Sequence, residues 1–127
     1  MTYRFEKHYT REEARALLPQ LRQWLDQLGE LRIEIDSNDR RLAGLMAAGQ
    51  DLGGELVNNS VKLLGTVKDL LQKFQDREII IKDLQRGLVD FPAFIGGKEV
   101  FLCWEKDETD VEFWHDIDSG YAGREPL

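Results

Sequence analysis

One cysteine and one histidine near the end of this sequence have the clearest capacity for chemistry. Cys103 and His115 lie in two β-prone segments joined by a short polar stretch, a pattern that predicts paired antiparallel strands. If Cys103 pairs with Phe113, the Cys103 and His115 side chains project from one face within a diagonal step, whereas a shift of one residue separates them. Thiolate and imidazole are metal ligands, and together they can also form a nucleophile. Cys103 and His115 are therefore the candidate metal ligands.

Three further polar residues in the same half of the chain are candidates for ligand binding: Asp90, Glu105 and Arg124. Asp90 stands between apolar residues, so its carboxylate needs compensation if it is buried. A metal would need Asp90 or Glu105 to complete its ligands, and no residue is assigned a catalytic role. The structural interpretation is favoured: Cys103 fills the core, His115 bonds a carboxylate or carbonyl, and Arg124 clamps the chain end to Asp90.

A small β-meander is expected to position these residues. β-branched and aromatic residues at a period of two predict strands at 78–82, 88–91, 99–104 and 111–117. Turn signals between them, including Pro92 to Gly97, are short enough to favour antiparallel neighbours, giving three to four strands. The third strand is apolar on both faces, so we expect the helices on one face and the N-terminal stretch, the C-terminal tail or a partner chain on the other.

The first part of the sequence predicts a long antiparallel helical hairpin. Thr10 and Glu13 form a capping box at the start, Pro19 predicts a kink or restart, and the glycine-rich stretch 48–54 predicts the turn. Apolar residues with alternating steps of three and four, missing only at Asn38, predict a long first helix, and the same spacing predicts a second over 55–75. The poor helix formers at 36–39 could instead cap a separate segment, but continuity is favoured. The first stripe consists of Ala14, Leu17, Leu21, Trp24, Leu28, Leu31, Ile35, Leu42 and Leu45. The fold class is therefore α+β, one domain with the hairpin at 10–76 and the meander with its tail at 77–127.

The two predicted helices differ in length, which leaves part of the first one without a helical partner. About twenty residues of the second helix can cover the first only back to Leu28, because both rise equally per residue. We expect the sheet and a second subunit to cover the remainder. Leu17, Leu21, Trp24 and Leu28 are accordingly the predicted self-association residues, in a homo-oligomer with a dimer favoured.

Composition narrows the class of partner. The chain has 24 acidic and 17 basic residues, a net charge of −7, which disfavours nucleic acid and anionic membrane surfaces. No apolar run is long enough to span a bilayer and no signal peptide is evident, so a cytoplasmic location is expected. The single cysteine excludes an intramolecular disulfide. No cofactor is predicted apart from the metal ion considered above.

Several ordered motifs carry a resemblance to a known family. They are Thr10–Pro19, Lys82-Asp83, Gly87–Ala93, Leu102–Trp104, Trp114-His115, Gly120, Gly123-Arg124 and Pro126. With these motifs the chain resembles the bacterial family catalogued as domain of unknown function 2203, over nearly its whole length. The resemblance implies no established activity, substrate or cofactor.

Two classes of function follow. The favoured one is a non-enzymatic protein-interaction module that self-associates through its hairpin. The alternative is a small-ligand or metal-binding protein, perhaps with enzymatic activity, whose pocket lies where the sheet meets the helices.

Overall fold

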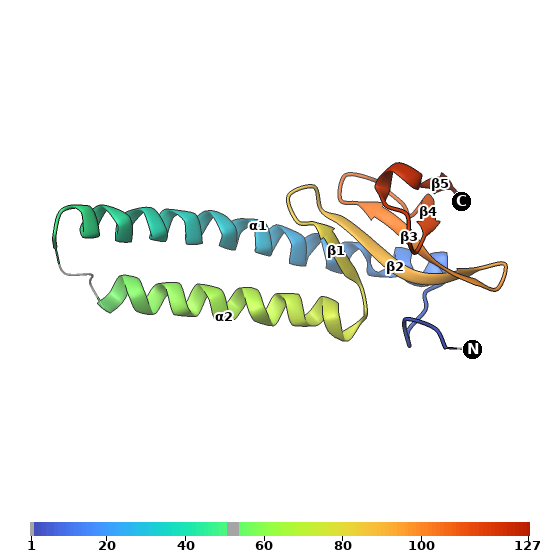
Figure 1. Ribbon diagram of the computed structural model, residues 1–127, viewed down its shortest axis with the longest axis horizontal. Coiled ribbons are helices and arrows are strands. Elements are labelled where there is room, and N and C mark those ends of the chain that lie inside the picture. The colour runs from blue at the N-terminus through green and yellow to red at the C-terminus, as the bar shows by residue number, and fades with distance from the viewer. Residues whose placement is uncertain (1, 51–53) are drawn as a thin grey trace.

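A computed structural model of the chain describes residues 2–50 and 54–127. It consists of two helices, α1 (Arg11–Ala47) and α2 (Gly54–Asp76), followed by an antiparallel sheet. The helices form an antiparallel hairpin that extends away from the sheet, as Figure 1 shows. The predicted α+β class and hairpin are therefore correct, and part of the predicted turn at 48–54 lies outside the described residues.

Helix α1 begins as predicted but continues where an interruption was expected. The Thr10 hydroxyl accepts from the Glu13 amide, and Glu13 bonds back to the Thr10 amide. The predicted kink or restart at Pro19 is wrong in one respect, because α1 runs unbroken through it. Pro19 and Arg15 are both exposed, so water can bond the Arg15 carbonyl that Pro19 leaves without an amide donor.

Asn38, the polar interruption of the first stripe, is buried between the two helices. Its side-chain amide donates to the Leu56 carbonyl at 3.0 Å and to the Ser60 hydroxyl, and its oxygen accepts from Asn59 at 3.3 Å. A single polar residue in an apolar seam fixes the register of two helices. Asn38 therefore aligns α1 with α2 rather than ending α1.

The sheet has five strands in sequential order, one more than the predicted three to four. They are β1 (Ile80–Asp83), β2 (Leu88–Ile95), β3 (Lys98–Glu105), β4 (Phe113–Asp116) and β5 (Glu125–Pro126), with the short 3-10 helix η1 (Tyr121–Gly123) before the last. Gly96 and Gly97 turn the chain between β2 and β3 with φ of 59° and 80°, the backbone of a tight two-residue hairpin.

Strand β2 passes through Pro92, which had been expected to begin a turn. The Pro92 carbonyl accepts from the Tyr9 amide at 2.7 Å, so the polar backbone groups of Pro92 point away from β3. The missing amide hydrogen therefore costs no bond in the β2–β3 ladder. By the same bond, the N-terminal segment takes up the edge of β2 beyond the end of β1.

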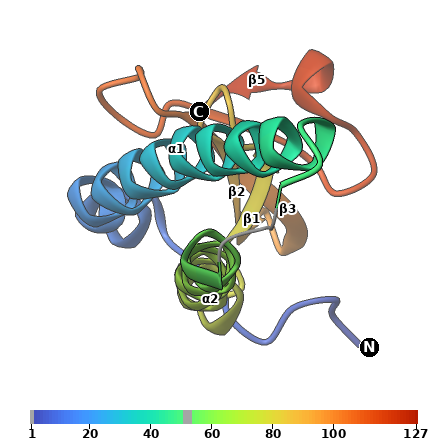
Figure 2. The same cartoon turned by 90° about the vertical axis from the view of Figure 1, so that its left-hand side faces the viewer.

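One face of the sheet packs on the helices and forms the main core. The cluster combines residues of α1 and α2 with alternate residues of β2 and β3. Its members include Leu18, Leu21, Trp24, Phe74, Val89, Phe91, Leu102 and Trp104. Figure 2, viewed along the hairpin, shows β1 and β2 next to the helices in projection, and Figure 1 shows that the sheet lies along the N-terminal part of α1 and largely beyond the end of α2. The sheet thus covers the part of α1 that α2 cannot reach, which confirms the first of the two predicted covers.

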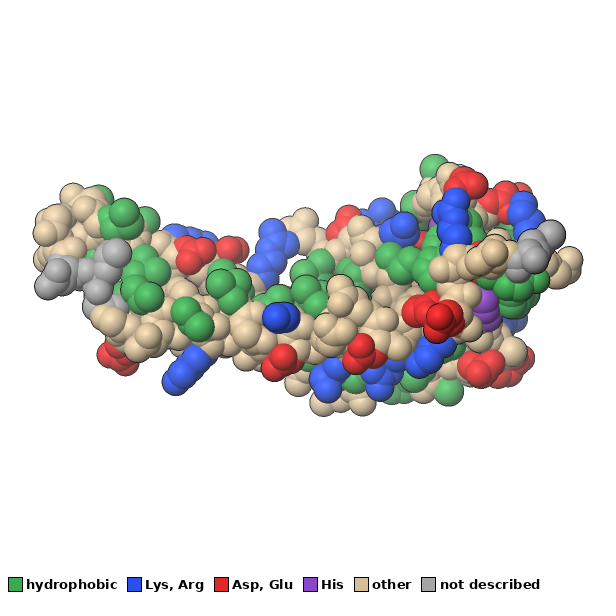
Figure 3. All heavy atoms as spheres, turned by 60° about the horizontal axis from the view of Figure 1, so that its bottom comes forward, with side chains coloured by type: hydrophobic (Ala, Val, Ile, Leu, Met, Phe, Trp, Pro, Cys, Tyr) green, Lys and Arg blue, Asp and Glu red, His purple; other side chains and the backbone are tan. Residues whose placement is uncertain are grey.

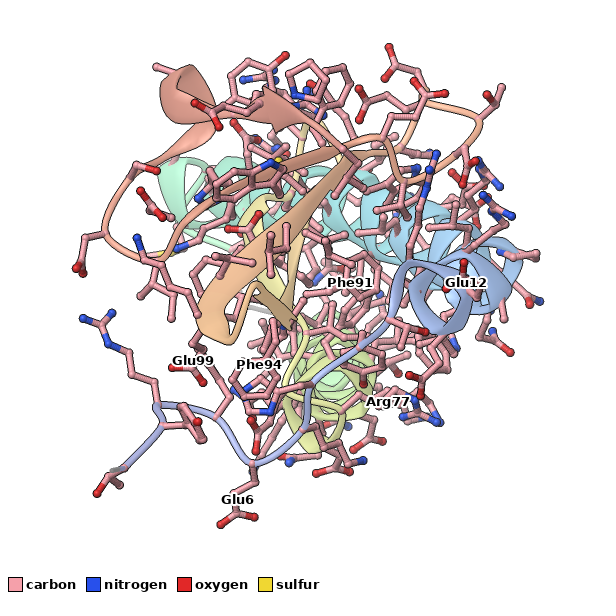
Figure 4. All side chains as sticks on the ribbon, turned by 90° about the vertical axis from the view of Figure 1, so that its right-hand side faces the viewer. Glu6, Glu12, Arg77, Phe91, Phe94 and Glu99 are labelled. Carbon is pink, nitrogen blue, oxygen red and sulfur yellow. The ribbon has the colours of Figure 1, made fainter. Side chains whose placement is uncertain are left out.

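The N-terminal segment is fastened to the sheet end of the molecule. The Glu99 carboxylate accepts from the backbone amides of Arg4 and Phe5 at 3.0 and 3.2 Å, and Phe5 packs edge-on against Phe101. Figure 4 shows Glu99 and Phe94 next to this segment. The N-terminal stretch thus supplies one cover of the outer face, as the sequence predicted. Neither described helix combines the length and apolar composition needed to cross a membrane.

Candidate functional site

Three of the five predicted site residues meet on the outer face of the sheet. Asp90 of β2 pairs with Cys103 of β3, and Cys103 pairs with Phe113 of β4. This is the register on which the sequence argument depended, so the Asp90, Cys103 and His115 side chains point to the same side. One potential ligand atom from each lies within 4.8 Å of the other two. We refer to these three residues as the strand triad.

The strand triad is sealed from solvent. The exposed fractions of Asp90, Cys103 and His115 are 1%, 1% and 2%. His115 Nε2 lies 3.1 Å from both carboxylate oxygens of Asp90, and His115 Nδ1 lies 2.8 Å from the Asp116 carbonyl oxygen. A carbonyl oxygen can only accept, so Nδ1 carries a hydrogen and Nε2 faces the carboxylate. The gap between Nε2 and Asp90 must therefore hold a proton or a cation.

Burial controls the acid–base chemistry of the triad. It raises the pKa of Asp90, an effect that the nearby His115 partly opposes. Burial also raises the pKa of Cys103 to about 12, and the Asp90 charge adds to this. A thiol in this condition is not a nucleophile at neutral pH. The cysteine–histidine nucleophile considered from sequence is therefore not supported by this environment, whereas an ion that displaces the thiol proton remains compatible with it.

The other two site candidates, Glu105 and Arg124, are engaged elsewhere. Glu105 binds the Arg86 guanidinium at 2.6 Å. Arg124 binds both carboxylate oxygens of Glu108 at 2.8 and 2.9 Å and lies over the Phe113 ring at 3.9 Å. The predicted clamp between Arg124 and Asp90 is therefore wrong, because His115 already compensates Asp90. Arg124 still fastens the chain end over the outer face, but through Glu108, whose role the sequence analysis missed.

A cavity does lie where the sheet meets the helices, but its lining is apolar for the most part. Its volume is about 440 Å³. The residues around it are Phe5, Leu71, Phe74, Gln75, Glu78, Ile79, Ile80 and Ile81. None of the five predicted site residues lines it. The pocket expected at this junction therefore gives no support to a ligand-binding role for Asp90, Glu105 or Arg124.

The predicted self-association residues lie inside a single chain. Leu21, Trp24 and Leu28 are buried in the core, with exposed fractions of 0%, 8% and 1%, and Leu17 packs against the core from its edge. The uncovered patch that had motivated their assignment is thus covered by the sheet and, at Trp24, by Phe74 of α2. Self-association itself stays a prediction, but its surface must be sought elsewhere.

An exposed apolar surface lies on the half of the hairpin beyond the sheet, which we call the arm (residues 29–47 and 54–68). Val57, Val61 and Leu64 on α2 have exposed fractions of 42%, 66% and 58%. Their spacing of four and three residues places them in one stripe, the arm stripe. Figure 3 shows hydrophobic side chains gathered along the arm. This stripe of three residues was not predicted from the sequence, although the periodicity that predicts the second helix also reveals it.

A comparison with known families bears out the resemblance noted in the sequence. Residues 7–127 match the family described as "Uncharacterized conserved protein (DUF2203)". The chain belongs to this family. No curated protein and no solved structure matches the chain. Family membership brings no substrate, cofactor or partner with it, so the functional argument rests on the chain's own residues.

Proposed function

We propose that this DUF2203 protein is a non-enzymatic protein-interaction module that self-associates as a homodimer through the arm. The observation that carries the proposal is the incomplete burial of the arm. Among its described residues, only Asn38 and Leu63 are buried. Residues of the first apolar stripe, such as Leu31, Ile35 and Leu42, are half-buried, and the arm stripe on α2 is exposed. Two helices alone do not enclose an apolar core, whereas four do.

A second copy of the chain is the occupant that fits this surface. It supplies another two-helix layer with the same spacing of apolar residues, and two-fold dimers are the commonest protein assemblies. At 1.5 Å per residue the arm is about 28 Å long, and two adjacent helices are about 20 Å wide. Pairing two such faces removes about 1,000 Å² of surface from water, the lower bound for a specific interface. The arm is thus large enough for a dimer and little more.

The position of the sheet favours one orientation of the two hairpins in the dimer. The sheet lies beside the hairpin at one end only (Figure 1), so two parallel hairpins facing each other would bring both sheets to the same place. An antiparallel arrangement sets each sheet beyond the end of the other arm. We therefore infer an antiparallel four-helix bundle. A cytoplasmic setting is part of the proposal and rests on the single cysteine of the sequence.

Sedimentation equilibrium on the full chain tests the dimer. The double substitution of Val61→Glu and Leu64→Glu places two charges in the proposed interface, and we expect it to weaken dimerisation at least about 100-fold, the equivalent of about 3 kcal/mol. The matched control substitutes glutamate at Asn58 and Thr66, which are exposed on the same helix outside the arm stripe. The control should remain dimeric. A monomeric unsubstituted protein, or equal dissociation of both variants, would refute the proposal.

A further inference from the structure

We propose that the strand triad of Asp90, Cys103 and His115 binds one divalent transition-metal ion, with zinc the best match to its donors. This site lies on the sheet and uses no residue of the arm, so it is independent of self-association. Sulfur, nitrogen and oxygen donors from β3, β4 and β2 converge there within 4.8 Å of one another. Zinc is the metal that combines cysteine, histidine and carboxylate ligands most readily in proteins.

The distances are compatible with one ion. Bonds of 2.0 to 2.3 Å in tetrahedral zinc sites place neighbouring ligand atoms about 3 to 4 Å apart. His115 Nε2 and the Asp90 oxygens stand at 3.1 Å, and the whole set lies within 4.8 Å. An ion at the centre therefore requires the side chains to move by about 1 Å or less.

The orientation of His115 has the form expected of a metal ligand. Its Nδ1 donates to the Asp116 carbonyl at 2.8 Å, and a histidine bound to a metal usually donates its other ring hydrogen to a carbonyl or carboxylate in this way. The contact fixes the ring and directs Nε2 at Asp90. The competing arrangement is a proton between Nε2 and the carboxylate, with Cys103 as a neutral thiol, and the experiment below distinguishes the two.

The charges and burial of the site indicate what the ion would do there. A carboxylate and a thiolate together balance a doubly charged ion, which offsets the cost of placing charge at a site exposed by 2% or less. The fourth position can be taken by the second carboxylate oxygen of Asp90, because both oxygens face His115 Nε2 at 3.1 Å. Because no substrate can reach so enclosed a site, the ion would be structural and would crosslink three adjacent strands. It would enter while the chain folds, before the outer face closes.

Cobalt provides the most direct probe. The full chain is unfolded and refolded with Co²⁺ or Zn²⁺, excess metal is removed by dialysis, and bound metal is counted by elemental analysis. We expect one ion per chain, and for cobalt the visible absorption of a four-coordinate site together with a sulfur-to-cobalt charge-transfer band. Cys103 is the only cysteine in the chain, so that band identifies its source.

Substitutions separate a bound ion from a shared proton. Cys103→Ser should abolish the charge-transfer band, and Asp90→Asn and His115→Gln should each lower metal affinity by about 100-fold or more, beyond what loss of a supporting contact causes. His8→Gln is the matched control, because His8 is the other histidine and also binds a carboxylate, Glu99, at 2.7 Å. It should retain the metal.

Two results would overturn the proposal, and both are measured on the unsubstituted protein. One is the absence of stoichiometric metal and of the cobalt bands from refolded, unsubstituted protein, which would leave a proton between His115 and Asp90. The other is a charge-transfer band that is missing although metal binds, which would place the ion elsewhere. Circular dichroism of each variant establishes folding, and thiol alkylation in the folded state adds a check, since bound metal should slow the modification of Cys103.

Discussion

The sheet end and the arm of this molecule differ in how completely they bury the apolar residues of the two helices. At the sheet end, α1, α2 and one face of the sheet enclose a core with residues such as Phe91 and Trp104 at 0% exposure. In the arm the same two helices continue without a third layer, and few of their described residues are buried. The comparison shows that the helices alone do not determine burial. What differs along the hairpin is the presence of the sheet.

The difference also separates the two proposed roles. The strand triad lies on the face of the sheet opposite the helices and is enclosed there by the two chain ends, with Phe5 covering one part of the outer face and Arg124 another. Such an enclosed place suits a structural ion or a shared proton. The arm stripe lies where a layer is missing, which suits association. The sheet end therefore has an enclosed polar site, and the arm has an exposed apolar surface.

The largest expected effect contrasts a core residue of the sheet with an exposed residue of the arm. Phe91→Ala should lower the free energy of unfolding by about 3 to 5 kcal/mol, because it leaves a cavity between the sheet and the helices. Ile33→Ala, at a position 71% exposed, should change it by about 0.5 kcal/mol or less. Urea unfolding followed by circular dichroism measures both. Similar losses would mean that the arm and the sheet end share one core, against the comparison above.

A smaller effect is expected within the arm, at its buried polar contact. Asn38→Ala removes the hydrogen bonds to Leu56, Ser60 and Asn59 and should cost about 1 to 2 kcal/mol. The loss should appear as faster amide hydrogen exchange in the arm portion of α2, while the sheet keeps its protection. Asn58→Ala, exposed on the same helix, is the control. Uniform loss of protection throughout the chain would show that Asn38 supports the whole fold instead.

Sequence periodicity predicted the fold more completely than the site, for identifiable reasons. The capping box at Thr10, the three-four spacing of apolar residues in the helices and the period of two in β3 are local signals, and the elements that they predicted were all confirmed. Pro92 was expected to begin a turn, but its backbone nitrogen faces away from β3, on the side where Tyr9, more than eighty residues away, bonds its carbonyl. The short strand β5 was missed since its pairing with β4 depends on the path of the tail.

Only part of the site was predicted from the sequence. Strand register can be argued from sequence, whereas the pairing of polar side chains cannot. Cys103 and His115 were placed together through the assumed pairing of Cys103 with Phe113, which is the observed one. The partner of Asp90 was misjudged because both His115 and Arg124 lie near the outer face, and only the three-dimensional path of the tail brings Arg124 to Glu108. Periodicity carries no information about that choice.

The smallest expected effect concerns pH and the attachment of the N-terminal segment to the sheet end. Burial raises the pKa of Glu99, but hydrogen bonds from the amides of Arg4 and Phe5 and from His8 outweigh it, so the pKa lies below its ordinary value of 4.5. A carboxyl group with a lowered folded-state pKa stabilises the fold above its unfolded pKa, and this contribution is lost as pH falls through the folded value. The native chain should therefore exceed Glu99→Gln in stability at pH 6, by less than about 1 kcal/mol because glutamine keeps an oxygen that can accept from the same amides.

Titration of that difference decides whether the Glu99 charge is responsible. The gap between the native chain and Glu99→Gln should close below pH 4.5, since a protonated Glu99 and a glutamine both lack the charge that the amides stabilise. Asp118→Asn is the matched control, because Asp118 also bonds the N-terminal segment, through the Arg4 side chain, but is exposed. A constant gap from pH 6 to pH 3 would mean that shape rather than charge holds the segment. The attachment of the N-terminal segment over the outer face would then be insensitive to acid.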